Sequence, residues 1–144
     1  MIIKEDIVGK LKEPLPKEAI SQHPTKAYLS TIKVIYVVER LNEVFGLGGW
    51  KVKNEFIEKV GDMVVVKAIF EAYLDKEIYI EAYGGNDNKD LGDAYKGACT
   101  DALSKIGSYL YIGMDVYKGL KDSPKTPYKG PNTASSNTSP ITDK

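Results

Sequence analysis

Alternating hydrophobic and polar positions predict three consecutive strands in the middle of the chain. Over residues 50–60, apolar side chains that begin with Trp50 alternate with polar ones, three of them lysines. Residues 63–74 are apolar on both faces, which is typical of a central strand, and residues 77–83 alternate again. Short turns at Gly61-Asp62 and Asp75-Lys76 separate the three runs. The pattern therefore predicts an antiparallel meander.

The stretch over residues 89–106 has the periodicity of an amphipathic helix. Small and apolar residues recur every fourth position in it: Ala94, Ala98, Ala102 and Ile106. Such a stripe allows a helix to pack closely on a sheet. Lys89 and Lys96 share a second face, and Lys105 lies on roughly the opposite side from them. We expect a flexible polar loop over Gly84–Asn88 before this helix.

Less regular segments flank this core. Residues 25–46 predict a helix capped by Thr25 and ended by Gly46, although the β-branched run 31–38 by itself also suits a strand. Residues 1–12 predict a short helix, and residues 13–25, with three prolines, an extended connector. The aromatic segment 109–117 is interpreted as either a core-closing segment or a subunit contact.

Together these elements predict an α+β fold. A helix, a three-stranded antiparallel β-meander and a long helix packed on the sheet form one domain over residues 1–118. The remainder, 119–144, is rich in Pro, Ser, Thr and Lys and predicts a disordered tail.

Composition narrows the class of protein. The 144 residues contain 42% hydrophobic and 28% charged residues, as in ordinary globular domains. Because 20 basic residues balance 20 acidic ones, polyanion binding has to come from local clusters, alone or arrayed by an oligomer. No apolar run is long enough for a membrane span, the acidic start does not resemble a signal peptide, and the single Cys99 excludes an internal disulfide. We therefore expect cytoplasmic residence.

Several chemistries are disfavoured. His23, the only histidine, lies in a proline-punctuated loop without neighbouring ligands. Asp87, Asp90 and Asp93 lack the frame of a calcium loop, and the glycines at 46–49 lack the following Lys-Ser/Thr of a phosphate loop. We find no pairing typical of nucleophilic or acid–base catalysis, so we expect no metal, no cofactor and no enzymatic activity.

Motifs on both sides of the meander resemble a known family. Residues 40–46 (RLNEVFG), then Gly49-Trp50, the three strands and residues 98–105 (ACTDALSK) are similar to the Rad-fifty-two-type single-strand annealing proteins. The closing segment 109–117 looks more like the bacterial and phage branch, Sak-like or DdrA-like. The resemblance covers roughly residues 25–120.

The resemblance implies ATP-independent binding of single-stranded DNA and annealing of complementary strands in recombination or repair. It also implies rings or filaments that hold DNA in a basic groove over a β-β-β-α core. Lys105 matches one basic position of the groove, and Lys96 another lysine of the same helix. The chain departs from the eukaryotic branch at Ser104, where a basic residue is expected, at Leu47, where an aromatic is, and at Tyr36, where an arginine is.

Candidate DNA contacts then follow from charge and ring chemistry. Basic side chains hold phosphates, and exposed rings stack on bases. The candidates are Arg40, Lys51, Lys53, Tyr79, Tyr83, Lys89, Lys96 and Lys105. Two alternatives stay open for them: a solvated lysine face on a core helix, and an internal ion pair for Arg40. The alternative function is a non-enzymatic oligomeric scaffold that binds protein partners through its tyrosine-rich surface and tail.

Overall fold

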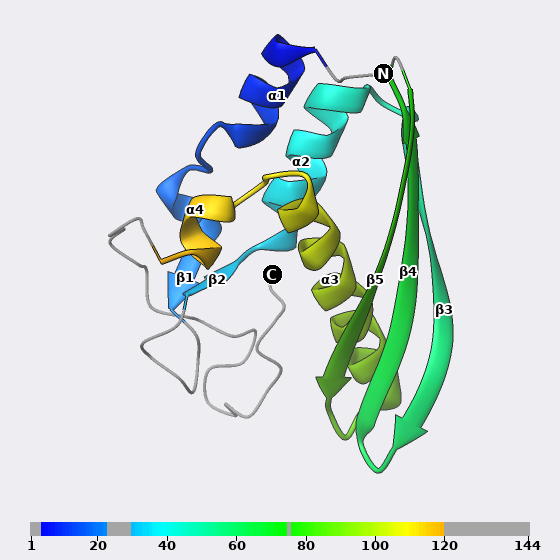
Figure 1. Cartoon of the computed structure of the whole chain (residues 1–144). Coiled ribbons are helices and arrows are strands. Elements are labelled where there is room, and N and C mark those ends of the chain that lie inside the picture. The colour runs from blue at the N-terminus through cyan, green and yellow to red at the C-terminus, as the bar shows by residue number, and fades with distance from the viewer. Residues whose placement is uncertain (1–3, 23–29, 75, 120–144) are drawn as a thin grey trace.

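The computed structural model describes residues 4–22, 30–74 and 76–119. In chain order the elements are α1 (Glu5–Lys12), η1 (Lys17–Ala19), β1 (Ile20–Gln22), β2 (Ser30–Ile32), α2 (Val34–Phe45), β3 (Trp50–Val60), β4 (Met63–Tyr73), β5 (Glu77–Asp87), α3 (Leu91–Tyr109) and α4 (Met114–Tyr117). Figure 1 shows the three long strands side by side, with α3 along one face and the shorter elements gathered at one end. The predicted α+β fold is confirmed.

The predicted meander is present as one antiparallel sheet of order β3-β4-β5. Strand β3 has the predicted bounds, and β4 is the central strand. Its burial alternates along its length, because side chains on one face pack against helices while those on the other stay partly exposed. Gly61, at a φ of 61°, makes the first turn with Asp62. The second predicted turn includes residue 75, which lies outside the described residues.

Helix α3 packs on the sheet through the predicted small-residue stripe. Ala94, Ala98, Ala102 and Ile106 are all 0% exposed. Its neighbour on the sheet is Gly84, where an added Cβ would collide with the backbone of Ala98 and Ala102. The helix backbone therefore approaches β5 more closely than a larger side chain at this position would allow.

This close approach explains why the predicted loop over Gly84–Asn88 is wrong. Strand β5 continues to Asp87, in register with β4 as far as the Met63 pair. The glycines are needed for helix packing, not for flexibility. The buried Asn86 side chain donates to the Asp93 carbonyl at 3.4 Å, so a polar residue is accommodated under the helix.

The helix predicted over residues 25–46 is also too long. Helix α2 begins at Val34 and ends, as predicted, at Gly46, whose φ is 89°. The β-branched residues before it form β2, which pairs with β1 in a second, two-stranded sheet. Thr25, expected to cap the helix, and His23 lie outside the described residues. The connector over 13–25 contains η1 and β1 as well as extended chain.

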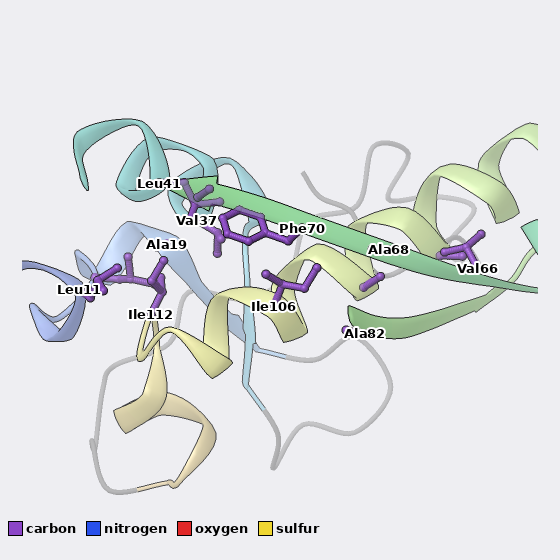
Figure 2. Packing of buried hydrophobic residues seen from close by; sticks show 14 of the residues in the cluster. Leu11, Ala19, Val37, Leu41, Val66, Ala68, Phe70, Ala82, Ile106 and Ile112 are labelled. Atoms are coloured by element: carbon purple, nitrogen blue, oxygen red, sulfur yellow. The ribbon is translucent and has the colours of Figure 1, made fainter. Parts of the chain in front are cut away.

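Elements from both ends of the described chain share one core. Figure 2 shows Leu11, Ala19 and Ile112 close together beside Val37 and Ile106. Ile112 is 1% exposed, so the segment 109–117 closes the core. Helix α1 confirms the predicted first helix over Glu5–Lys12, whereas the expected tail lies beyond the described residues apart from Gly119.

Aromatic contacts anchor the start of β3 in the same core. Trp50 stacks on Phe70 with ring centroids 5.8 Å apart, and Phe45 meets Phe70 edge-on at 5.9 Å. The Trp50 indole N–H donates to the Asn42 side-chain oxygen at 2.8 Å. The turn at residues 46–49 thus places Trp50 against both α2 and β4.

Candidate nucleic-acid interface

The outer face of the sheet is the face opposite α3. Cross-strand pairing places its side chains in rows, because directly opposed residues share a face. One row contains Lys51, Glu71 and Tyr79, and the next contains Lys53, Ile69 and Glu81. A third contains Glu55, Lys67 and Tyr83. Helix α3 packs against β4 and β5 on the other face of the sheet.

A depression on this outer face brings three of the candidate residues together. Lys51, Lys53 and Tyr79 line it, with Ile69 and Glu71 beside them. It therefore combines two ammonium groups with an aromatic ring and an apolar floor, the mixture that a phosphate backbone and an unstacked base require.

Each lysine of the outer face has an acidic neighbour. Lys51 Nζ lies 3.3 Å from Glu71, and Lys53 Nζ lies 3.7 Å from Glu55. Lys67 Nζ lies between Glu55, at 3.8 Å, and Glu81, at 3.7 Å. Exposed pairs of this kind are worth only about 0–1 kcal/mol each, so a phosphate group can replace the carboxylate at small cost. Across these three rows, three lysines balance three glutamates in one protomer.

Tyr79 and Tyr83 both project from β5 on this face and are 53% and 56% exposed. The Tyr79 hydroxyl donates to Glu81 at 2.5 Å, and this hydrogen bond is the main reason that the pKa of Tyr79 is raised. The two rings are four residues apart on one strand, a spacing of about 13 Å. They offer two separate stacking surfaces.

Sequence reasoning missed two features of this face. Lys67 was counted within an apolar strand, although strict alternation places it beside Ile69 on the outer side. A β-bulge between Phe56 and Glu58 shifts the register, so Lys59 pairs with Val64 and leaves the face that carries Lys51 and Lys53. The expected face with three lysines from β3 therefore has two.

The two lysines of α3 are not brought together. Lys96 is exposed and lies two residues from the buried Ala98, on the side of the helix that points away from the sheet. Lys105 lies at the edge of β5, where its ammonium group donates to the Tyr83 carbonyl at 3.1 Å and to Asp101 at 3.2 Å. Of the pair, Lys105 is the one that contacts the backbone of Tyr83.

Lys89 is exposed and lies apart from Lys96 and Lys105. It precedes α3, whose first turn is capped by the Asp90 side chain, which accepts from the Asp93 N–H at 2.9 Å. The neighbouring Asn88 N–H donates to the Asp62 carbonyl, which places Lys89 at the hairpin end of the sheet. Lys51 lies at the other end of β3.

Arg40 takes the internal position that was the alternative to phosphate contact. Its side chain is 7% exposed, and its guanidinium donates to the carbonyls of Lys10 at 3.1 Å and Glu13 at 2.7 Å. It also lies 3.4 Å from Glu43. The carbonyls at the C-terminus of α1 thereby gain donors, so Arg40 fastens α1 to α2.

Over the described ranges, no three His, Cys, Asp or Glu side chains gather as a metal site would require. Within the same part of the chain, every helix is too short or too polar to cross a membrane.

Comparison with known proteins identifies the family. The model of the Rad52/22 family of double-strand break repair proteins matches residues 4–117, from the start of α1 to the end of α4. A comparison with curated proteins gave no match. The family match includes the meander, α3 and the segment 109–117, which carried the resemblance in the sequence. The chain therefore belongs to the Rad52/22 family of double-strand break repair proteins.

Proposed function

We propose that this protein binds single-stranded DNA and anneals complementary strands without ATP and without enzymatic chemistry. The observation that carries the proposal is the depression in which Lys51, Lys53 and Tyr79 meet on the outer face. Membership of a double-strand break repair family supports the same conclusion.

Lysines that are already paired with acidic side chains suit annealing. Strands have to be held by their backbones, with bases available, and weakly enough to test one register after another. When DNA binds, Lys51 exchanges Glu71 for a phosphate group, and Lys53 exchanges Glu55 for one. Each exchange replaces one ionic contact by another, so the affinity at each site is modest. Repetition of such sites over several copies of the chain, in a ring or filament, makes the total binding strong.

The experiment compares the salt dependence of binding in two variants. Fluorescence anisotropy of a labelled oligonucleotide is recorded over a range of salt concentrations for the natural protein and for Lys51→Ala/Lys53→Ala. Loss of two phosphate contacts lowers the slope of log K against log salt by about 1.4, from about 0.7 for each contact on a single strand. Lys17→Ala, an exposed lysine of η1, is the matched control and leaves the slope unchanged.

Unchanged binding by a double variant that keeps its far-ultraviolet circular dichroism would refute the role of this face. Strand annealing is followed with two complementary labelled oligonucleotides, with and without ATP. Equal rates are expected in both conditions, and a requirement for ATP would contradict the proposal.

A second candidate function is a scaffold for protein partners. Three tyrosines gather at the C-terminal end of α3 and beyond it and are 42% or more exposed: Tyr109, Tyr111 and Tyr117. Lys12 lies over the Tyr111 ring at 4.6 Å. This function predicts no affinity for oligonucleotides even at low salt, so the same anisotropy experiment separates the two.

A further inference from the structure

Lys67 differs from the other two lysines of the outer face in how far its side chain is buried. The side chain of Lys67 is 23% exposed, against 78% for Lys51 and 74% for Lys53. It projects from β4, the central strand, and stands opposite Glu55 of β3 and Tyr83 of β5. Because neighbours on both sides enclose it, its ammonium group is less accessible to a phosphate group than those of the other two lysines.

The ammonium group of Lys67 lies between two carboxylates, each of which has a second partner. Oε1 of Glu55 is 3.8 Å from Lys67 Nζ, and its Oε2 is 3.7 Å from Lys53 Nζ. Oε1 of Glu81 is 3.7 Å from Lys67 Nζ, and its Oε2 accepts the hydrogen bond of the Tyr79 hydroxyl. A chain of polar contacts therefore crosses all three strands. Lys53 and Tyr79, at its two ends, both line the depression.

Lys67 offsets the negative charge of both carboxylates. Since both lie within 3.8 Å of one nitrogen, they are nearer to one another than the Debye length of about 8 Å at physiological salt. Without Lys67 they would repel each other and an incoming phosphate group. Glu55 would also be left with Lys53 as its one basic neighbour on this face, and would compete more strongly with phosphate for it.

The balance of charge on the outer face depends on the same residue. Across the three rows of this face three lysines balance three glutamates, so loss of Lys67 leaves one negative charge in excess. That excess would lie beside the side chains that line the depression. A face that has to hold a polyanion is thereby protected from its own glutamates.

We propose that Lys67 is a positioning residue of the DNA-binding face, which acts through Glu55 and Glu81 and not by contact with a phosphate group. It offsets the two carboxylates and draws Glu55 away from Lys53, so that Lys53 exchanges its acidic partner for phosphate more readily. This inference rests on the proposed function, because it concerns how the same face holds single-stranded DNA.

A charge-neutral rescue tests this role. Lys67→Met keeps the length of the side chain without its charge and is expected to weaken oligonucleotide binding about fivefold at low salt, which is about the worth of one unit charge near another in water. Lys67→Met/Glu81→Gln also removes one opposing charge and is expected to restore the affinity and the salt slope of the natural protein. Lys67→Arg keeps the charge and should bind as the natural protein does. Fluorescence anisotropy over a range of salt concentrations measures all four proteins.

Lys67→Met/Glu18→Gln is the matched control. It has the same net charge as the rescue variant, but Glu18 is an exposed residue of η1, outside the sheet. It should bind as weakly as Lys67→Met. Circular dichroism and urea denaturation check that each variant is folded, and Lys67→Gln takes the place of a methionine variant that does not fold.

The proposal is overturned if folded Lys67→Met binds as the natural protein does, or if Glu81→Gln and Glu18→Gln have the same effect on it. It is also overturned if the salt slope of Lys67→Met/Glu81→Gln stays about 0.7 below that of the natural protein, because such a loss marks a direct phosphate contact. The proposed function fails on a different result, namely when the natural protein does not bind or when Lys51→Ala/Lys53→Ala binds equally well.

Discussion

The two faces of β4 differ although they belong to one strand. On the inner face Val64, Val66, Ala68 and Phe70 are 0% exposed and pack against the helices. On the outer face Lys67 keeps 23% of its side chain exposed between two glutamates. The difference shows that alternate residues of one strand serve separate purposes: the inner ones hold the fold together, and the outer ones are free to serve binding.

Removal of the largest inner side chain should have the largest effect. Phe70→Ala leaves a cavity between Trp50 and Phe45 and is expected to lower the free energy of unfolding by about 3–5 kcal/mol. Urea denaturation followed by circular dichroism measures it. Ile69→Ala, the neighbouring outer-face residue, is the control and should cost clearly less. Similar losses at both positions would contradict the division between the faces.

Two neighbouring glycines of β5 test the same difference between the inner and outer faces of the sheet, because Gly84 lies under α3 and Gly85 does not. Gly84→Ala forces the backbone of α3 away from the sheet and is expected to destabilise the fold by about 1–3 kcal/mol. At Gly85 an added Cβ meets Met63 Sδ and the Val64 carbonyl at an ordinary 3.5 Å, so Gly85→Ala should be far milder. Thermal unfolding of the two variants measures the difference. Equal melting temperatures would show that α3 is not held as closely as described.

The smallest effect on stability is expected at the two lysines of α3. Lys105→Ala removes a charge next to Tyr83 and should lower the salt slope of oligonucleotide binding by about 0.7. Lys96→Ala, on the far side of the helix, should leave it unchanged. Anisotropy titrations measure both slopes. A reduced slope for Lys96→Ala alone would place the DNA on the back of α3 and not on the outer face of the sheet.

Local periodicity was sufficient to predict the three-stranded meander and the buried stripe of α3. The bounds of β3 and the buried alanines of α3 follow from residues a few positions apart. The extension of β5 does not, because Gly84 and Asn86 resemble loop residues until α3 is placed over them. A strand was left open as an alternative for the run 31–38, and the pairing of β2 with β1, which that run alone does not reveal, decides for a strand over Ser30–Ile32.

The residue types of the candidate site were predictable from the sequence, but their contacts with other strands and helices were not. Alternation placed Lys51, Lys53 and Tyr79 on one face, and pairing between strands brought them around one depression. The acidic partner of Lys51 is Glu71 of the neighbouring strand, which periodicity within β3 does not reveal, whereas Glu55 shares the strand and face of Lys53. Arg40 was ambiguous because its acceptors are carbonyls of α1, which no pattern in the side chains reveals.

Asp101 and Lys105 have a consequence for how far the sheet can grow. Since they occupy the backbone groups of Gly85 and Tyr83, an incoming strand has no continuous row of partners on that side. Among the described strands, the border along β3 is then the one where a further strand can be added. One carboxylate and one ammonium group on a helix thereby limit growth of the sheet to one direction.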